Sequence, residues 1–142
     1  IYICIDYRNY ARIYQLIEKH FTIKNCIVWD KMSIGMGASY RFQHEFIIYA
    51  VKGKPVLNFE KRNVSDVWHC KRASGKYKHP TQKPSDLMEL PIKYSSNPGD
   101  LVLDPFAGSF TVAAACKKLD RNFISGELDN KYCEIGKEKL NN

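Results

Sequence analysis

Residues 101–111 place an apolar run, an acidic residue, a loop of small residues and a helix start in direct succession. The run 101–103 is typical of a buried strand, because short apolar stretches bounded by turn residues form the strands of parallel sheets. Asp104 follows this strand, and Gly108 precedes a helix predicted over 111–119. Ligands of α/β proteins bind beyond the carboxyl ends of the strands. The segment therefore predicts an α/β fold with a ligand site at this edge.

Apolar periodicity predicts further strands and helices along the chain. Strands are expected at 1–5, 26–29, 44–51 and 122–126, and helices at 10–20, 84–95 and from Asp129 onward. Pro91 falls inside the second of these helices and is expected to kink or end it. The 30–43 loop is long for a compact domain, and such loops are often functional. The length of 142 residues fits one domain of ordinary size.

The positive charge is concentrated in one short stretch. The chain has 22 basic and 15 acidic residues, a net charge of +7 with neutral histidines. Residues 61–79 contribute +5 of this, against +3 from 1–60 and −1 from 80–142. The stretch has no strand or helix period, so it is predicted to be irregular. A basic patch of this kind suits a polyanion such as nucleic acid, although a solvated loop that maintains solubility is an equal alternative from charge alone.

Glu127 ends the next predicted strand, 19 residues after Gly108. An acidic side chain at this spacing can accept both ribose hydroxyls of a nucleoside. The loop at 104–109 lacks the GxGxxG pattern of a pyrophosphate cradle. An acidic loop suits a cationic nucleoside better, and S-adenosyl-L-methionine (AdoMet), with its sulfonium, is such a ligand. The alternative is that Asp104 and Glu127 only cap turns, but their combined spacing favours a cofactor site.

Two motifs resemble those of the DNA N6-adenine and N4-cytosine methyltransferases. Asp-Pro-Phe-Ala-Gly-Ser at 104–109 resembles their AdoMet-binding motif, and His-Pro-Thr-Gln-Lys-Pro at 79–84 resembles the element just ahead of it. Their order and separation are similar to those of the circularly permuted β-group of the family. Gly-Glu-Leu-Asp at 126–129 resembles the next motif, and Trp-Asp-Lys at 29–31 also has the family's appearance. The resemblance covers nearly the whole chain.

The resemblance implies a site for AdoMet. The residues implied to bind it are Thr81, Gln82, Lys83, Asp104, Phe106, Gly108, Ser109 and Glu127. Glu127 would hold the ribose hydroxyls, Asp104 would lie near the amino group, and Phe106 would pack on the adenine or the cofactor edge. The 108–109 pair would line the methionine part. The 81–83 segment would contact the cofactor's carboxylate, to which a lysine offers a point charge and donors.

The same resemblance implies a contact with double-stranded DNA. The segment 61–79 lies where the family places its target-recognition region. The residues implied to contact phosphates are Lys61, Arg62, Lys71, Arg72, Lys76 and Lys78. Such contacts give affinity and salt dependence rather than sequence selectivity. Because the segment is short for a recognition domain, the 30–43 loop is also expected to share in base reading.

Two departures from the family pattern stand out. The family usually has glycine where this chain has Phe110, so a positive φ there would cost about 1 kcal/mol or more. The family's Asp-Pro-Pro-Tyr-type loop, which grips the flipped base, has no counterpart, because the sequence contains no Pro-Pro. No catalytic residue is therefore assigned within this chain. No metal site is expected either, since the five cysteines form no CxxC pair.

The family's sheet order, 3-2-1-4-5-7-6, divides the chain into three segments. Residues 1–60 would supply strands 5, 6 and 7 of a Rossmann-like methyltransferase sheet. Residues 61–79 would contact DNA, and 80–142 would form the AdoMet-binding half with strands 1 and 2. Strands 3 and 4 have no counterpart here, and strand 4 belongs in the middle of the sheet. We therefore expect an upstream segment or a partner chain to complete the sheet, because unpaired central backbone groups are costly.

These features predict a site-specific DNA methyltransferase of the restriction-modification type, present here as a carboxyl-terminal portion that is inactive alone. It would transfer a methyl group from AdoMet to an exocyclic amine, with adenine N6 preferred and cytosine N4 possible. One alternative is a non-catalytic remnant or subunit that binds AdoMet or DNA. Another is an AdoMet enzyme that acts on RNA or protein. No apolar run reaches the roughly 20 residues of a membrane span, and a cytoplasmic location is expected.

Overall fold

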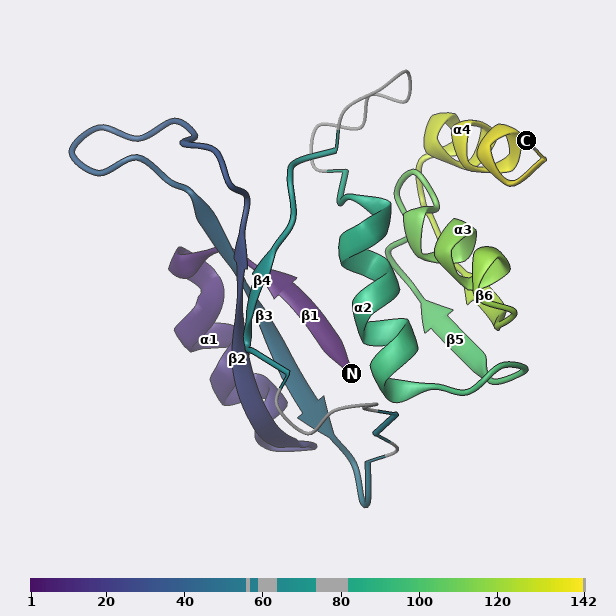
Figure 1. Cartoon of the computed structure of the whole chain (residues 1–142), viewed down its shortest axis with the longest axis horizontal. Coiled ribbons are helices and arrows are strands. Elements are labelled where there is room, and N and C mark those ends of the chain that lie inside the picture. The colour runs from purple at the N-terminus through teal and green to yellow at the C-terminus, as the bar shows by residue number, and fades with distance from the viewer. Residues whose placement is uncertain (56, 59–63, 74–81, 142) are drawn as a thin grey trace. The chain divides into compact units, whose positions relative to one another are not determined.

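The structure is a computed structural model that describes residues 1–55, 57–58, 64–73 and 82–141 (Figure 1). Strands and helices alternate along the chain, as expected of an α/β fold. The chain forms two compact units rather than the single domain expected from its length. The first contains Ile1–Pro55 and Phe59–Arg72, and the second contains Val56–Asn58 and Ala73–Asn142.

The first unit is built on a four-stranded sheet. Its strands are β1 (Tyr2–Ile5), β2 (Thr22–Asp30), β3 (His44–Val51) and β4 (Val67–His69), in the order β1-β3-β2-β4. β3 runs antiparallel to both β1 and β2, while β4 runs parallel to β2. The order β1-β3-β2 agrees with the 5-7-6 order that the family resemblance predicted.

β3 supplies most of the core of the first unit. Residues 47–51 are all buried, which explains why this strand is a continuous apolar run rather than an alternating one. Ile47 and Ile48 are fully buried, and each such aliphatic side chain stabilises the fold by about 1.5–3 kcal/mol. Trp29 is also buried, and its indole N–H donates to the Cys70 carbonyl at 2.7 Å. A buried indole therefore has its hydrogen-bond partner.

Helix α1 (Tyr7–Ile17) begins where the Asp6 carboxylate accepts hydrogen bonds from the Arg8 and Asn9 N–H groups. This is an N-cap, and it starts the helix three residues before the predicted position. α1 contacts β3. β4 was not predicted, since 61–79 was expected to be irregular. Three residues are too few to show a period, and β4 is defined by its pairing with β2.

The second unit combines a two-stranded sheet with three helices. Its elements are α2 (Ser85–Ser95), β5 (Leu101–Asp104), α3 (Thr111–Lys118), β6 (Asn122–Ser125) and α4 (Asn130–Asn141). β5 and β6 pair in parallel, as the family's strands 1 and 2 do. Within the described residues, β5 pairs with β6 alone and β1 with β3 alone.

Helix α2 packs on α3, with Leu87 and Cys116 fully buried. The helix continues through Pro91 to Ser95, so Pro91 does not end it. Proline removes one helical N–H, but the burial of Ile92 on the following turn holds that turn in place. Cys116 is buried, whereas Cys4 and Cys26 are half-buried.

Glu89 of α2 is buried and ion-paired. Its carboxylate accepts hydrogen bonds from Lys118 of α3 at 2.6 Å and from Lys93 at 3.0 Å. Burial alone would raise the pKa of Glu89, but the two lysines outweigh it and lower the pKa below its ordinary value. The carboxylate therefore connects α2 to α3 in its charged form. No helix in the described part of the chain is long and apolar enough to cross a membrane.

Candidate functional site

The predicted cofactor loop and the loop after β6 are joined by backbone hydrogen bonds. Asp104 and Ser125 are paired at the carboxyl ends of β5 and β6. The Gly126 N–H donates to the Asp104 carbonyl at 2.9 Å, and the Ala107 N–H donates to the Gly126 carbonyl at 2.8 Å. The two strand ends therefore form one continuous rim, as the sequence predicted.

Glu127 organises this rim through its carboxylate. One oxygen accepts from the Gly108 N–H at 2.7 Å, and the other accepts from the N–H groups of Leu128 and Asp129 at 2.9 and 3.0 Å. Gly108 has a φ of 52°, a left-handed conformation in which glycine avoids the steric cost of a Cβ. Glu127 thus lies beside Gly108, where no Cβ separates the backbone from a ligand.

Asp104 lies half-buried at the end of β5. One carboxylate oxygen accepts from the Phe106 N–H at 3.2 Å. Burial raises the pKa of Asp104, the Phe106 hydrogen bond opposes this shift, and the charge of Glu127 adds to it. A carboxylate in such a poorly solvated place favours a nearby cation. The Phe106 side chain itself is 88% exposed, so its ring is accessible to a ligand.

Both acidic side chains also cap local turns, which was the alternative to a cofactor site. Asp104 bonds two residues ahead, and Glu127 bonds one and two residues ahead. The bond from Glu127 to Gly108, however, joins two loops that are 19 residues apart. Glu127 therefore connects the two loops of the rim, in addition to the local turns that both carboxylates stabilise.

Ser109 is buried, at 4% exposure. Its hydroxyl lies 3.3 Å from that of Thr111, which accepts a hydrogen bond from Lys139 of α4 at 3.0 Å. Burial lowers the pKa of Lys139. Thr111 and Lys139 were not predicted as site residues. Lys139 lies 28 positions from Thr111, and no local pattern indicates this contact.

Phe110 adopts the left-handed conformation that the family's usual glycine suggested, with φ 56° and ψ 37°. Its ring packs directly against Gly136 of α4, where an added Cβ would overlap the ring atoms. Gly136 is buried in the helix interior, where glycine is otherwise unfavourable by about 0.5–1 kcal/mol relative to alanine. The close approach of the Phe110 ring explains why glycine is present there.

The predicted element ahead of the loop is described only in part. Thr81 lies outside the described residues. Lys83 is half-buried just before the Pro84 N-cap of α2. The Gln82 side-chain oxygen is buried and has no hydrogen-bond partner in the part of the chain that the structure describes, and the same holds for the Ser125 hydroxyl. Unsatisfied buried polar groups are rare and call for an explanation such as a ligand.

The predicted DNA-contacting residues are also covered in part. Lys71 and Arg72 are exposed in the first unit. The other four, Lys61, Arg62, Lys76 and Lys78, lie outside the described residues. The Arg72 guanidinium lies against Gly35, at a position that a Cβ on this glycine would occupy. The basic segment therefore contacts the 30–43 loop.

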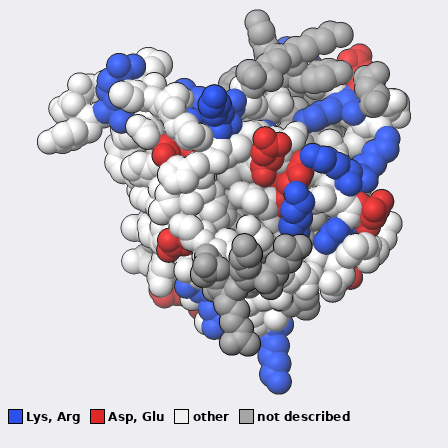
Figure 2. Space-filling model, viewed as in Figure 1, with Lys and Arg blue, Asp and Glu red and all other residues white. Residues whose placement is uncertain are grey.

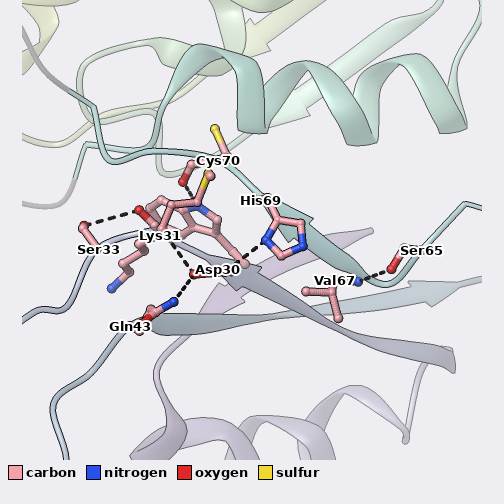
Figure 3. A network of polar contacts seen from close by, with 10 residues as sticks. Asp30, Lys31, Ser33, Gln43, Ser65, Val67, His69 and Cys70 are labelled. Atoms are coloured by element: carbon pink, nitrogen blue, oxygen red, sulfur yellow. Dashed lines mark hydrogen bonds and ion pairs between the residues drawn. The ribbon is translucent and has the colours of Figure 1, made fainter.

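A polar network that the sequence did not predict lies where β2 and β4 end (Figure 3). Asp30 accepts from the Met32 N–H at 2.8 Å and from the Gln43 side chain at 2.9 Å, and it contacts His69 Nδ1 at 3.0 Å. Hydrogen bonds from Gln43 and Met32, and then His69, lower the pKa of Asp30. The Cys70 N–H donates to the Asp30 carbonyl at 3.0 Å. An ionised Asp30 thus connects both ends of the long loop to β4.

Three residues of the second unit can be compared with the charged groups of AdoMet. Gln82 offers a buried acceptor without a partner, and Asp104 offers a carboxylate that favours a cation. Gly108 offers backbone that a ligand can approach closely. AdoMet carries an ammonium and a sulfonium, so the residues present fit its chemistry.

The parallel strands and the acidic rim at their carboxyl ends are the arrangement of α/β proteins that bind ligands at strand ends. Within that class, the chain belongs to the DNA methylase family of N6 and N4 methyltransferases, which matches residues 1–138. This confirms the resemblance that the motifs indicated.

Among curated relatives, the type II methyltransferase M.HpaI of Haemophilus parainfluenzae is 32% identical over 167 residues, covering 99% of this chain and 52% of its own length. The DNA adenine methyltransferase YhdJ of Escherichia coli K12 is 32% identical over 175 residues, covering 99% of this chain and 60% of its own. The chain thus spans about half the length of the curated relatives it matches.

Solved structures agree with this assignment. The M1.HpyAVI–SAM complex superimposes with a TM-score of 0.84 and 37% identity, covering 98% of this chain and 72% of that one. The cytosine-N4-specific PvuII DNA methyltransferase superimposes with a TM-score of 0.72 at 18% identity, which shows the fold alone. The chain therefore has the α/β fold of the AdoMet methyltransferases.

Proposed function

We propose that this chain is the AdoMet-binding and DNA-contacting portion of an enzyme that methylates an exocyclic amine of a DNA base, adenine N6 in preference to cytosine N4. The observation that carries the proposal is the rim at the ends of β5 and β6. There, two carboxylates and the left-handed Gly108 converge. This rim supports a nucleoside cofactor that carries positive charge.

Bound AdoMet would supply the methyl group from its sulfonium for direct transfer to the amine. Asp104 would hold the amino group of the methionine part, and Glu127 would hold the ribose hydroxyls. Lys83 would meet the carboxylate with a point charge, and the exposed ring of Phe106 would cover the adenine or the cofactor edge. These residues contribute positioning and electrostatics rather than covalent catalysis.

The target base must leave the stack before its amine can reach the methyl group. Lys71 and Arg72, together with Lys61, Arg62, Lys76 and Lys78, would hold the duplex by its phosphates. The group that grips the flipped base would come from outside this chain, since the sequence holds no Pro-Pro loop. We therefore propose that the 142 residues alone transfer no methyl group.

We further propose that an upstream segment or a partner chain supplies strands 3 and 4 of the sheet. The edge of β5 supports this, because within the described residues β5 pairs with β6 alone. The same segment or chain would also supply a covering layer, because Leu101, Leu103 and Ile124 are all more than half exposed. In the register of β5 and β6, Leu103 is paired with Ile124, and Leu101 shares its face. An apolar sheet face normally packs on a further layer. The segments 1–60, 61–79 and 80–142 would then act as predicted above.

The test is methyl transfer from labelled AdoMet to duplex DNA by the protein in its complete form, followed by mapping of the modified base. We expect methylated adenine, with no transfer to RNA or protein. Transfer to RNA or protein in place of DNA would contradict the substrate. Binding of AdoMet and DNA without turnover would favour the second candidate, a non-catalytic subunit, which the missing Pro-Pro loop supports.

A second test isolates the role of Glu127, which organises the rim and is proposed to hold the ribose. Adenosine and 2′-deoxyadenosine are compared as ligands of the wild-type protein and of Glu127→Gln. We expect the wild type to prefer adenosine about tenfold, because one charge-assisted hydrogen bond is lost with the hydroxyl. We expect the variant to lose this preference. A variant that binds both ligands more weakly but keeps the preference would contradict the ribose assignment.

A further inference from the structure

Residues 31–43, called the 31–43 arm here, join β2 to β3 and extend away from the sheet (Figure 1). The arm exposes the large apolar side chains Met32, Ile34, Met36, Tyr40 and Phe42. Met36 and Tyr40 are 89% and 91% exposed, so local packing within the loop does not cover them. Five large apolar side chains exposed on one short loop mark an interaction site.

The arm has a defined backbone. The Gly35 N–H donates to the Phe42 carbonyl at 2.7 Å, and the Phe42 N–H donates to the Met36 carbonyl at 3.1 Å. The Arg41 side chain donates to the Gly35 carbonyl at 2.8 Å. These bonds hold the residues before and after the tip together, so the tip is presented on a preformed support.

The base of the arm is fixed as well. The Lys31 N–H donates to the Gln43 carbonyl at 2.9 Å, and the Asp30 carboxylate accepts from the Met32 N–H and from Gln43. Phe42 stacks on Tyr7 of α1 with ring centroids 5.4 Å apart. The apolar tip is therefore oriented before any partner binds, which lowers the entropic cost of binding.

The charge of the arm suits a polyanion. Residues 31–43 contain no acidic side chain. Arg41 lies within the arm, and the Arg72 guanidinium packs against it at Gly35. Figure 2 shows mostly uncharged atoms at the projecting end, with basic side chains nearby. An apolar tip beside arginines has the composition of a wedge that enters duplex DNA.

We propose that the 31–43 arm inserts Met36 and Tyr40 into the DNA duplex beside the target base. The inserted side chains replace base stacking that is lost when the duplex opens, since an aromatic ring stacks on any base. Arg41 and Arg72 hold the flanking phosphates and fix the depth of insertion. This inference rests on the proposed DNA-modifying function and assigns to the arm a role separate from the cofactor rim.

The test uses duplex DNA with 2-aminopurine beside the target base and compares wild type with the double variant Met36→Ala, Tyr40→Ala. Wild-type binding should raise the 2-aminopurine fluorescence, because an inserted side chain unstacks the neighbouring base. The double variant should bind about tenfold more weakly and leave the fluorescence near that of free duplex. Its thermal unfolding should be unchanged, because both side chains are almost fully exposed.

The matched control is Leu16→Ala, an exposed apolar side chain on α1 outside the arm. It should bind and unstack DNA as the wild type does. Equal binding and equal fluorescence for the double variant would overturn the proposal while leaving the DNA function intact. Loss of self-association instead of DNA binding would also overturn it and assign the arm to a protein interface. A wild type that binds no duplex would overturn both the arm proposal and the proposed function.

Discussion

Phe110 and Gly136 form a matched pair in the cofactor half of the chain. Phe110 has a left-handed backbone that costs a non-glycine residue about 1 kcal/mol or more. Its ring uses the space that a Cβ at 136 would occupy. The backbone strain at Phe110 and the glycine at 136 therefore both belong to one packing contact between the Phe110 ring and α4.

The first prediction is a double-mutant cycle on this pair. Gly136→Ala alone should destabilise the protein by about 1–3 kcal/mol, because the new methyl group overlaps the ring. In a Phe110→Gly background, the same change should be neutral or should stabilise by up to about 1 kcal/mol, since alanine favours the helix. Urea unfolding of the four proteins measures the coupling. Equal effects of Gly136→Ala in both backgrounds would show that the two residues do not interact.

The second prediction separates stability from binding at Asp104. Because burial raises its pKa, the ionised carboxylate destabilises the folded state at neutral pH. Asp104→Asn should therefore raise the melting temperature while weakening AdoMet binding about tenfold. Binding by the wild type should fall as the pH drops through the raised pKa, because the protonated acid attracts no cation. Calorimetric titration across pH measures the AdoMet affinity of the wild type and of the variant. Unchanged affinity in the variant would remove Asp104 from the site.

At this scale, the sequence could predict residues whose role depends on local spacing. Asp104 ends β5 as predicted, and Gly108 and Glu127 lie in the loops that follow β5 and β6, since strand ends and chain separation suffice to locate them. Lys139 could not be predicted, because its contact with Thr111 depends on how α4 lies against the loop. The same limit explains why the Asp30 network was missed.

At the scale of elements, the ion pairs of Glu89 connect two helices whose packing is otherwise apolar. Glu89 is 5% exposed and contacts lysines from α2 and α3. A buried carboxylate with two lysine donors is costly to neutralise. The stabilisation that the Glu89 ion pairs provide should therefore depend on pH, and the direction of the pKa shift of Glu89 decides whether it rises or falls with pH.

The third prediction follows from this direction. The pKa of Glu89 is lower in the folded state than its ordinary value of 4.5, so its stabilising effect is complete above that value and is lost as the pH falls below it. Glu89→Gln should cost about 2 kcal/mol at neutral pH and progressively less as the pH falls below the ordinary value. The control is Glu134→Gln, which breaks the exposed Lys137 pair and should leave the free energy of unfolding nearly unchanged. A Glu89→Gln cost that does not change with pH would contradict the assignment.

Most elements could be predicted from apolar patterns, and the exceptions have physical reasons. The strand at 44–51 was predicted at its observed bounds, because its residues are buried on both faces. β4 could not be predicted, since three residues become a strand only by pairing with β2. Pro91 was expected to kink or end α2, but the helix extends past it to Ser95, with Ile92 buried on the turn that follows.

At the scale of the whole molecule, the two-stranded sheet of β5 and β6 leaves apolar surface uncovered. Leu101 and Leu103 are 62% and 66% exposed on β5, and Ile124 is 56% exposed on β6. Two parallel strands cannot form an independent stable sheet, because sheets of this kind need cover on both faces. This supports the proposal that a further segment or chain completes the sheet.

The last prediction uses Leu103→Lys to test whether a further segment or chain covers the apolar face of β5 and β6. In the 142-residue chain, the change should leave the melting temperature nearly unchanged, because Leu103 is largely exposed. In the protein in its complete form, the same change should cost about 2–3 kcal/mol, since a lysine would replace a leucine that has become buried. Leu16→Lys on α1 is the control and should have a small effect in both forms. An equally small effect of Leu103→Lys in both would show that this face stays exposed to solvent, and the proposed covering layer would then be wrong.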